Sequence, residues 1–214
     1  MKANSRVVTK VADLPVSLHL ITRDVPLYHA TEEEISKVMP SPYWGFVWPG
    51  GFGVSRYILS NPSLVAGKRV LDFGSGSSVV GITAALSGSS SVLCSDIDSV
   101  SLAASSLNAE LNGVAPSLRF SARDLVGEDV SGSFDVILAG DVAYDKEMAG
   151  PIFRWLVHHA EKTDTKVIVG CPGRNYLDMS HMVERACYQI HPDLAENASS
   201  GFSSTKVFEI VHRN

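Results

Sequence analysis

The sequence predicts an α/β protein with a doubly wound sheet, in which helices cover both faces and form a three-layer sandwich. Two observations support this prediction. From residue 68 onwards, short apolar runs alternate with longer segments of helical character, as in successive β-α units. The first run, residues 69–73, ends in the turn Gly74-Ser75-Gly76-Ser77-Ser78, and a helix follows at once. A strand, a glycine turn and a helix in this order are typical of a nucleotide-binding unit.

The other elements follow along the chain. Residues 16–21 are expected to form a peripheral strand, and Thr31 followed by three glutamates predicts a helix start. A short helix is expected at 52–59. The predicted strands of the main sheet are 69–73, 92–95, 118–122, 134–140 and 165–170. The predicted helices are 79–87, 100–111, 147–161 and one that ends near Cys187. Two last strands, at 188–194 and 205–211, enclose a polar loop.

The composition suits one globular domain with a substantial core, since the chain has 214 residues of which 45% are hydrophobic. A net charge of −5 gives no indication of a broad basic surface, which argues against a protein whose main function is to bind nucleic acid. No apolar run reaches the length needed to cross a membrane. The three cysteines lack zinc spacing and indicate a reducing compartment, and we expect no metal site.

We divide the chain into an N-terminal extension, residues 1–41, and a domain that spans residues 42–214. The first 12 residues contain three basic residues and no acid, a composition also found in organelle-targeting segments. An ordinary flexible start is the alternative, which the residues alone favour slightly.

An aromatic segment opens the domain. Tyr43, Trp44, Phe46 and Trp48 stand among prolines and glycines in residues 40–51. Aromatic residues this dense in a loop either fill a core or line a ligand site. Spacing alone does not decide between these roles, and without further context core packing is the expectation.

Ligands of doubly wound sheets bind beyond the carboxyl ends of the strands. Gly74 and Gly76 follow the first predicted strand and allow close approach of a ligand to the backbone. Asp96 follows the second strand, where an acid can accept hydrogen bonds from both ribose hydroxyls. Asp124 follows the third and could bind an adenine amino group. The fourth ends at residues 140–144, Gly-Asp-Val-Ala-Tyr.

Each of these acids has an alternative role as a helix cap or turn residue, and for Asp98 we expect the cap. A nicotinamide-binding domain competes as an interpretation, but the third glycine of Gly-x-Gly-x-x-Gly is Val79 here. Asp72 instead stands two residues before Gly74, and the pattern Asp-x-Gly-x-Gly resembles class I S-adenosylmethionine (SAM)-dependent methyltransferases. This resemblance implies a Rossmann-like sheet of seven strands with an antiparallel last strand. It also implies SAM as cofactor and S-adenosylhomocysteine as product.

Further segments sharpen the resemblance. They are Pro42-Tyr43-Trp44, Val47-Trp48-Pro49-Gly50-Gly51, Leu71-Asp72-Phe73-Gly74-Ser75-Gly76, Asp96-Ile97-Asp98, Leu107-Asn108-Ala109-Glu110-Leu111-Asn112, Gly140-Asp141-Val142-Ala143-Tyr144-Asp145 and Cys171-Pro172-Gly173-Arg174. Together they resemble the seven-strand protein methyltransferases marked by Asp-x-x-Tyr. Within that group the chain is most similar to the electron transfer flavoprotein beta subunit lysine methyltransferases.

The resemblance implies a function and a partner. The function is methyl transfer to lysine side chains, and the partner is the electron transfer flavoprotein beta subunit. It implies the mitochondrial matrix as location, with the cytoplasm as the alternative. We expect a monomer without nucleic-acid or membrane partners. Alternatives are a related enzyme that methylates another protein lysine, a histidine or a small amine, and a catalytically silent SAM-binding protein.

The same resemblance implies roles for individual residues. Asp141 and Tyr144 would be the catalytic pair: the Asp141 carboxylate or its main-chain carbonyl would orient the lysine nitrogen, and Tyr144 would line the entry channel. The residues implied for cofactor binding are Trp48, Asp72, Gly74, Ser75, Gly76, Asp96, Asp124, Leu125 and Gly140. Two positions depart from the family pattern: Ser78 replaces the usual glycine, and Cys171 replaces a frequent aspartate.

Overall fold

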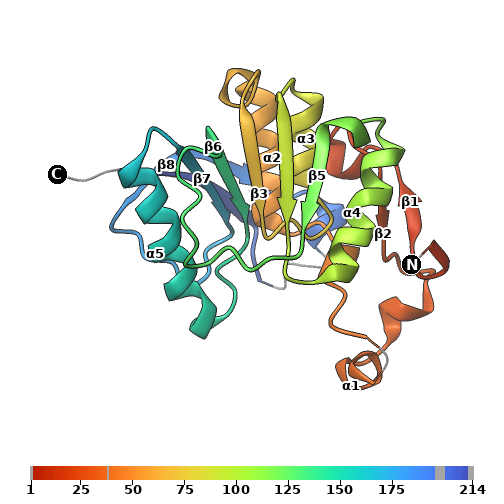
Figure 1. The fold of residues 1–214 in the computed structure, drawn as a ribbon. Coiled ribbons are helices and arrows are strands. Elements are labelled where there is room, and N and C mark those ends of the chain that lie inside the picture. The colour runs from red at the N-terminus through yellow and green to blue at the C-terminus, as the bar shows by residue number, and fades with distance from the viewer. Residues whose placement is uncertain (1, 38, 196–200, 212–214) are drawn as a thin grey trace.

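A seven-stranded sheet forms the centre of the computed structural model, which describes residues 2–37, 39–195 and 201–211 (Figure 1). Its strands are β3 (Arg69–Phe73), β4 (Ser91–Ser95), β5 (Leu118–Ser121), β6 (Val136–Gly140), β7 (Lys166–Cys171), β8 (Met182–Gln189) and β9 (Ser204–Ile210). They are ordered β5-β4-β3-β6-β7-β9-β8. All neighbours from β5 to β7 are parallel, whereas β9 is antiparallel to both β7 and β8. The predicted sheet with its antiparallel last strand is confirmed.

Helices cover both faces of the sheet, as the doubly wound prediction requires. The helices are α1 (Glu32–Ser36), α2 (Pro49–Ser60), α3 (Val79–Leu86), α4 (Ser99–Leu111), α5 (Lys146–Lys162) and α6 (Pro192–Ala195). Figure 1 shows α5 on one side of the sheet and α2 and α3 on the other. Val70 packs into the core on the α2–α3 side, whereas Leu71 and Phe73 join the core beneath α5. This alternation follows from the two-residue period of a strand.

The C-terminal part differs from the sequence prediction. No helix ends near Cys187; residues 182–189 form strand β8, and the strand expected at 188–194 therefore begins six residues earlier. β8 is an edge strand that pairs only with β9 among the described strands, so most of its side chains are at least partly exposed. Glu184 and Arg185 form ion pairs with Lys206 and Glu209 of β9. These charged residues obscure the apolar alternation that identifies a strand.

The N-terminal extension packs against the domain. Strands β1 (Arg6–Val8) and β2 (Leu18–Leu20) pair antiparallel, which confirms the predicted peripheral strand, and they lie beside α4 (Figure 1). Asn108 of α4 and Asn112, which follows the helix directly, accept hydrogen bonds from the backbone N–H groups of His19 and Ser17. Thr31 caps α1 in a reciprocal arrangement with Glu34, as its sequence predicts. None of the described helices is long and apolar enough to span a bilayer.

The start of α2 approaches the sheet so closely that only glycine fits. A Cβ on Gly140, at the end of β6, would lie 2.7 Å from the Cα of Gly51. A Cβ on Gly170 of β7 would collide with the carbonyl oxygen of Gly50. The first turn of α2 therefore rests directly on the carboxyl ends of β6 and β7.

The turn between β3 and α3 is held from two sides. Beneath it, Asp72 is buried and its Oδ2 accepts a hydrogen bond from Gly81 N–H at 2.8 Å. Burial raises the pKa of Asp72 to about 8, and the nearby Asp96 charge adds to the shift against the opposing Gly81 bond. From α4, Asn108 Nδ2 donates to the carbonyl oxygen of Ser77 at 3.0 Å.

Ser78 occupies a backbone conformation that favours glycine, with φ of +58°. Its buried hydroxyl donates to Ser105 Oγ at 2.7 Å, and Ser105 donates in turn to the carbonyl oxygen of Gly76. The hydrogen bond offsets part of the conformational cost, so the turn keeps its form without the glycine usual at this position.

We expect Ser78→Gly to change the free energy of unfolding by less than about 1 kcal/mol. It relieves about 1–2 kcal/mol of left-handed strain and removes a hydrogen bond of similar value. Ser78→Ala keeps the strain and loses the bond, and should destabilise by about 1–2 kcal/mol. Urea unfolding of the three proteins checks this order; equal stability of the wild type and Ser78→Ala would contradict it.

Asp72 should make the ligand-free protein less stable as the pH rises. Between its ordinary pKa of 3.8 and about 8, the folded protein keeps a proton that the unfolded chain has lost. The resulting loss of stability is at most about 1.4 kcal/mol per pH unit. Asp72→Asn removes this dependence, so its melting temperature should rise above that of the wild type by about 3–5 °C per pH unit between pH 5 and 8. A difference that stays constant with pH would count against the burial argument.

Candidate active site

The glycine turn and Asp96 meet at the carboxyl end of the sheet. Gly74 N–H and Ser75 N–H both donate to the carbonyl oxygen of Ser95, the last residue of β4. Gly76 N–H donates to Asp96 Oδ2 at 2.8 Å. Burial raises the pKa of the half-buried Asp96, against the lowering effect of its backbone hydrogen bonds. Asp96 is thus fixed at the rim of the turn, beside the ends of two adjacent parallel strands.

Asp98 has the capping role expected for it. Its carboxylate accepts hydrogen bonds from Val100 N–H and Ser101 N–H, at the start of α4. Its own N–H donates to Asp96 Oδ1 at 2.9 Å. The cap therefore also orients Asp96.

The turn has features that suit a bound SAM. Gly76 has a φ of +50°, and a Cβ added there would meet nothing within 4 Å. Ser75 Oγ is buried and has no hydrogen-bond partner among the described residues. An open approach to the backbone and an unpaired hydroxyl suit a polar ligand lying over the turn. Asp72, by contrast, faces Gly81 beneath the turn, and its direct contact with the cofactor stays a prediction.

Asp124 and Leu125, the two residues expected to bind the adenine, differ in burial. Asp124 is exposed, and its Oδ1 accepts a hydrogen bond from Val126 N–H at 2.9 Å. Leu125 is buried in the core on the α5 side of the sheet. The end of β5 does lie beside Asp96, whose N–H donates to the carbonyl oxygen of Ser121. Adenine binding by Asp124 and Leu125 stays a prediction.

Asp141 follows Gly140 at the end of β6 and is buried, with a φ of +63°. Its N–H donates to the carbonyl oxygen of Gly170 at 2.8 Å, which extends the β6–β7 pairing by one bond. The carboxylate forms a two-point ion pair with Arg174: Nε lies 2.8 Å from Oδ1 and Nη2 lies 3.2 Å from Oδ2. Gly50 N–H, in the first turn of α2, points to Oδ2 at 3.5 Å. Both oxygens of the Asp141 carboxylate therefore already have hydrogen-bond partners within the protein.

Tyr144 stands at the exposed mouth of this end of the sheet, with 45% of its surface accessible. Its ring centroid lies 5.5 Å from that of Tyr43, which in turn lies 5.6 Å from Trp48. Burial of its hydroxyl raises the pKa of Tyr144, and the nearby Tyr43, Asp96, Asp145 and Asp141 add to the shift. The phenol therefore stays neutral at physiological pH, in a negatively charged surrounding.

The aromatic segment divides between core and site. Trp44 is 1% exposed and packs with Ile21 and Ala104, so core packing is correct for this residue. Trp48 is half-buried, and its Nε1–H donates to the carbonyl oxygen of Tyr43 at 3.0 Å. This hydrogen bond holds the rings of Tyr43 and Trp48 together, and the Tyr43 ring lies next to Tyr144.

Sequence reasoning assigned no role to Arg174 or Cys171. Cys171 Sγ accepts hydrogen bonds from the N–H groups of Gly173, at 3.4 Å, and Arg174, at 3.2 Å. A side chain that accepts from the residues two and three positions ahead is the Asx-turn pattern, so the thiol serves where an aspartate would. Burial raises the pKa of Cys171, which keeps it a thiol. The segment Cys171-Pro172-Gly173-Arg174 was the signal in the sequence that could have pointed to these two residues.

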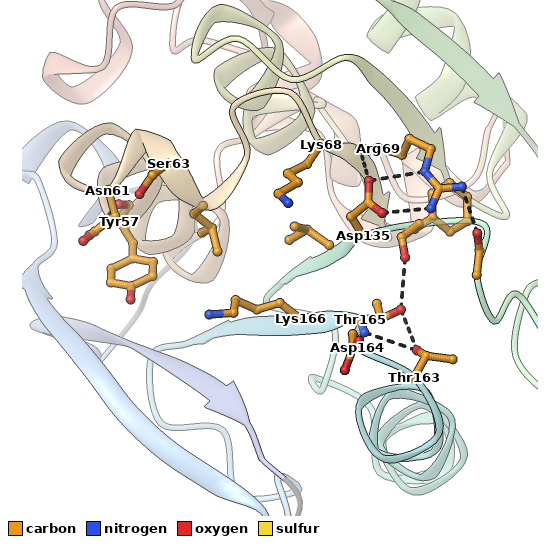
Figure 2. A pocket seen from close by; sticks show the side chains of 14 residues that line it. Tyr57, Asn61, Ser63, Lys68, Arg69, Asp135, Thr163, Asp164, Thr165 and Lys166 are labelled. Atoms are coloured by element: carbon orange, nitrogen blue, oxygen red, sulfur yellow. Dashed lines mark hydrogen bonds and ion pairs between the residues drawn. The ribbon is translucent and has the colours of Figure 1, made fainter.

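A hollow of about 670 Å³ lies elsewhere, at the amino ends of β3, β6 and β7 (Figure 2). Lys68 and Lys166 line it, and the Arg69 guanidinium forms an ion pair with Asp135 at its edge. None of the predicted site residues lines this hollow. Within the described ranges, no group of three His, Cys, Asp or Glu side chains could hold a metal ion.

Comparisons with known proteins agree with this geometry. The family model of the ribosomal protein L11 methyltransferase (PrmA) matches residues 59–148. A solved structure, the magnesium protoporphyrin IX methyltransferase of Synechocystis PCC 6803 with bound SAM, is similar in fold. It aligns with a TM-score of 0.54 and 18% identity over 76% of this chain and 78% of that chain.

Two curated relatives are similar over nearly the whole chain. The electron transfer flavoprotein beta subunit lysine methyltransferase of Danio rerio is 34% identical over 210 residues, which cover 96% of this chain and 80% of that protein. The homolog of that enzyme in Caenorhabditis elegans is 34% identical, over 91% of this chain and 88% of its own length. The chain therefore belongs to the family of electron transfer flavoprotein beta subunit lysine methyltransferases, and it is a SAM-dependent methyltransferase with the class I fold.

Proposed function

We propose that this chain transfers methyl groups from SAM to lysine side chains of the electron transfer flavoprotein beta subunit, in the mitochondrial matrix. The observation that carries the proposal is the position of the Asp-x-x-Tyr segment beside the glycine turn: a Cβ on Gly74 would lie 2.9 Å from Val142, and Asp96 and Asp141 both lie near Tyr144. The names of the relatives support the substrate.

The reaction is a displacement at carbon. Bound SAM supplies an electrophilic methyl group on a positively charged sulfur. The lysine nitrogen forms a bond to this carbon with its lone pair, and the carbon–sulfur bond breaks to leave S-adenosylhomocysteine. The amine must therefore be neutral and in line with the breaking bond, and the protein contributes mainly by holding this geometry.

Of the two groups on Asp141 that could orient the lysine nitrogen, we favour the main-chain carbonyl. The carboxylate is engaged by Arg174 through two hydrogen bonds. The carbonyl oxygen accepts no hydrogen bond from the described residues, and the positive φ of Asp141 turns this part of the backbone away from regular strand geometry. The carbonyl is thus an available acceptor for an amine N–H at the end of β6.

Tyr43 and Tyr144 suit the entrance for a lysine side chain. Their exposed rings present apolar surface to the methylene chain and π-faces to the ammonium group as it approaches. Asp145, exposed at the start of α5, adds negative charge nearby. Such a mouth favours a cationic substrate group.

Ser78, the departure that suggested a catalytically silent protein, does not weaken the proposal. Its hydroxyl bonds to Ser105, while Gly76 keeps its open approach and Asp96 keeps its bond to the turn. The features that suit a bound cofactor are all retained.

The first test is intact-mass analysis of the electron transfer flavoprotein beta subunit after incubation with this protein and SAM. We expect mass gains in steps of one methyl group, absent without SAM. No mass gain, with SAM binding demonstrated, would contradict the proposed substrate. Methylation of a different protein or a small amine in the same assay format would redirect the proposal to that acceptor.

Two substitutions should separate catalysis from cofactor binding. Asp141→Ala should lower kcat about 100-fold, because it removes the ion pair with Arg174 that holds this part of the backbone, and reacting groups misplaced by about 1 Å lose that much, while the Kd for SAM changes less than about threefold. Asp96→Ala should weaken SAM binding about 10- to 100-fold through loss of charged hydrogen bonds. Calorimetric titration with SAM and initial rates measure the two effects. Equal losses of SAM affinity in both variants would contradict the assignment of Asp141.

A further inference from the structure

Arg174 and Asp141 form the most enclosed ion pair near the site. Exposed fractions of their side chains are 21% and 2%, and two guanidinium nitrogens meet the two carboxylate oxygens. This fork-to-fork geometry fixes both the orientation and the charge of the carboxylate. A lysine would give one point charge and no such fork.

The surrounding chain holds Arg174 in place. Its backbone N–H is bound by Cys171 Sγ, within a turn whose Gly173 has a φ of +112°. On the other side, the Phe202 ring lies 5.2 Å from the guanidinium carbon. Burial alone would lower the pKa of Arg174, but its hydrogen bond to Asp141 and the charge of that residue outweigh burial and raise it. The guanidinium therefore stays charged and close to Asp141.

The other titratable groups around the pair carry no compensating positive charge. Cys171, which burial keeps as a thiol, and Tyr144, which is a neutral phenol, both lie near Asp141. Asp96 and Asp145 lie near Tyr144 and add negative charge. Within the described part of the chain, Arg174 is the cation that contacts Asp141.

This arrangement addresses a problem of the reaction. A lysine ammonium must release a proton before it can accept a methyl group, yet an opposite charge within about 4–6 Å raises the pKa of an amine by about 1–3. An unpaired Asp141 carboxylate at this position would hold the substrate as the unreactive ammonium ion.

We propose that Arg174 is a positioning residue that occupies the Asp141 carboxylate, so that the substrate lysine loses its proton to water and meets the methyl donor as a neutral amine. This inference rests on the proposed lysine methylation, and it concerns proton release rather than the identity of the substrate. It predicts that removal of the guanidinium changes the pH dependence of turnover and leaves SAM binding nearly intact.

The test is the pH profile of kcat for Arg174→Ala, measured by initial rates on the electron transfer flavoprotein beta subunit between pH 6.5 and 10. We expect the acid limb to move to higher pH by about 1 or more, so that kcat falls at least about tenfold near pH 7.5 and recovers towards the wild-type value near pH 9.5. Arg174→Lys should restore most of the wild-type profile because it keeps the charge. Arg185→Ala, which removes a guanidinium from an ion pair on the edge strand β8, is the matched control and should leave the profile unchanged.

A double variant separates the charge effect from damage to the fold. Asp141→Asn combined with Arg174→Ala removes the carboxylate as well, so its acid limb should return to the wild-type position even if its maximal rate is low. A displaced limb in the double variant, or an Arg174→Ala protein whose rate falls equally at every pH, would overturn the inference. Thermal unfolding and SAM titration of each variant show whether it is folded, and a displaced limb in a folded double variant overturns the inference even if Arg174→Ala does not fold.

The outcome distinguishes this inference from the function on which it rests. A wild-type protein that adds no methyl group to the beta subunit overturns both. An active wild type whose pH profile is the same as that of Arg174→Ala overturns only the role of Arg174.

Discussion

The arrangement of the active site depends on how closely α2 approaches the sheet. Backbone meets backbone where Gly50 and Gly51 lie against Gly140 and Gly170, and no side chain separates them. Because protein interiors are close-packed, one methyl group at this contact would displace the helix. The same helix start carries the aromatic segment and directs an N–H towards Asp141. This one packing contact therefore fixes the position of the aromatic segment relative to the end of β6.

Each acid at the site is held by a different partner. Asp72 is held beneath the turn by a backbone N–H of α3, Asp96 at the rim by the N–H of Gly76, and Asp141 by a guanidinium. Burial raises the pKa of the first two acids. A site that receives a sulfonium and an amine gains from acidic surroundings, but only while the acids do not retain the proton of the amine. The pairing of Asp141 reconciles these two requirements.

Local sequence patterns predicted the strands from β3 to β7, the glycine turn and Asp96, because parallel strands end at one edge and bring such residues together. The helix α4 was predicted, but its buried face carries small and polar residues such as Asn108, since it packs on the turn and on β2. Contacts between residues far apart in the sequence could not be predicted in this way. Arg174 lies 33 positions from Asp141, and only the folded turn after β7 brings them together. The edge strand β8 carried charge where strand patterns expect apolar residues.

That edge strand has a consequence for how the protein behaves among other proteins. An unpaired strand edge offers a template for another chain, and natural proteins commonly protect it with charged side chains. On β8, Glu184 and Arg185 are already joined to β9 across the strand pair. A second strand that paired with β8 would remove water from both ion pairs and would supply no polar partner in its place. The charged residues that kept β8 from being predicted as a strand thus disfavour edge-to-edge aggregation at this end of the sheet.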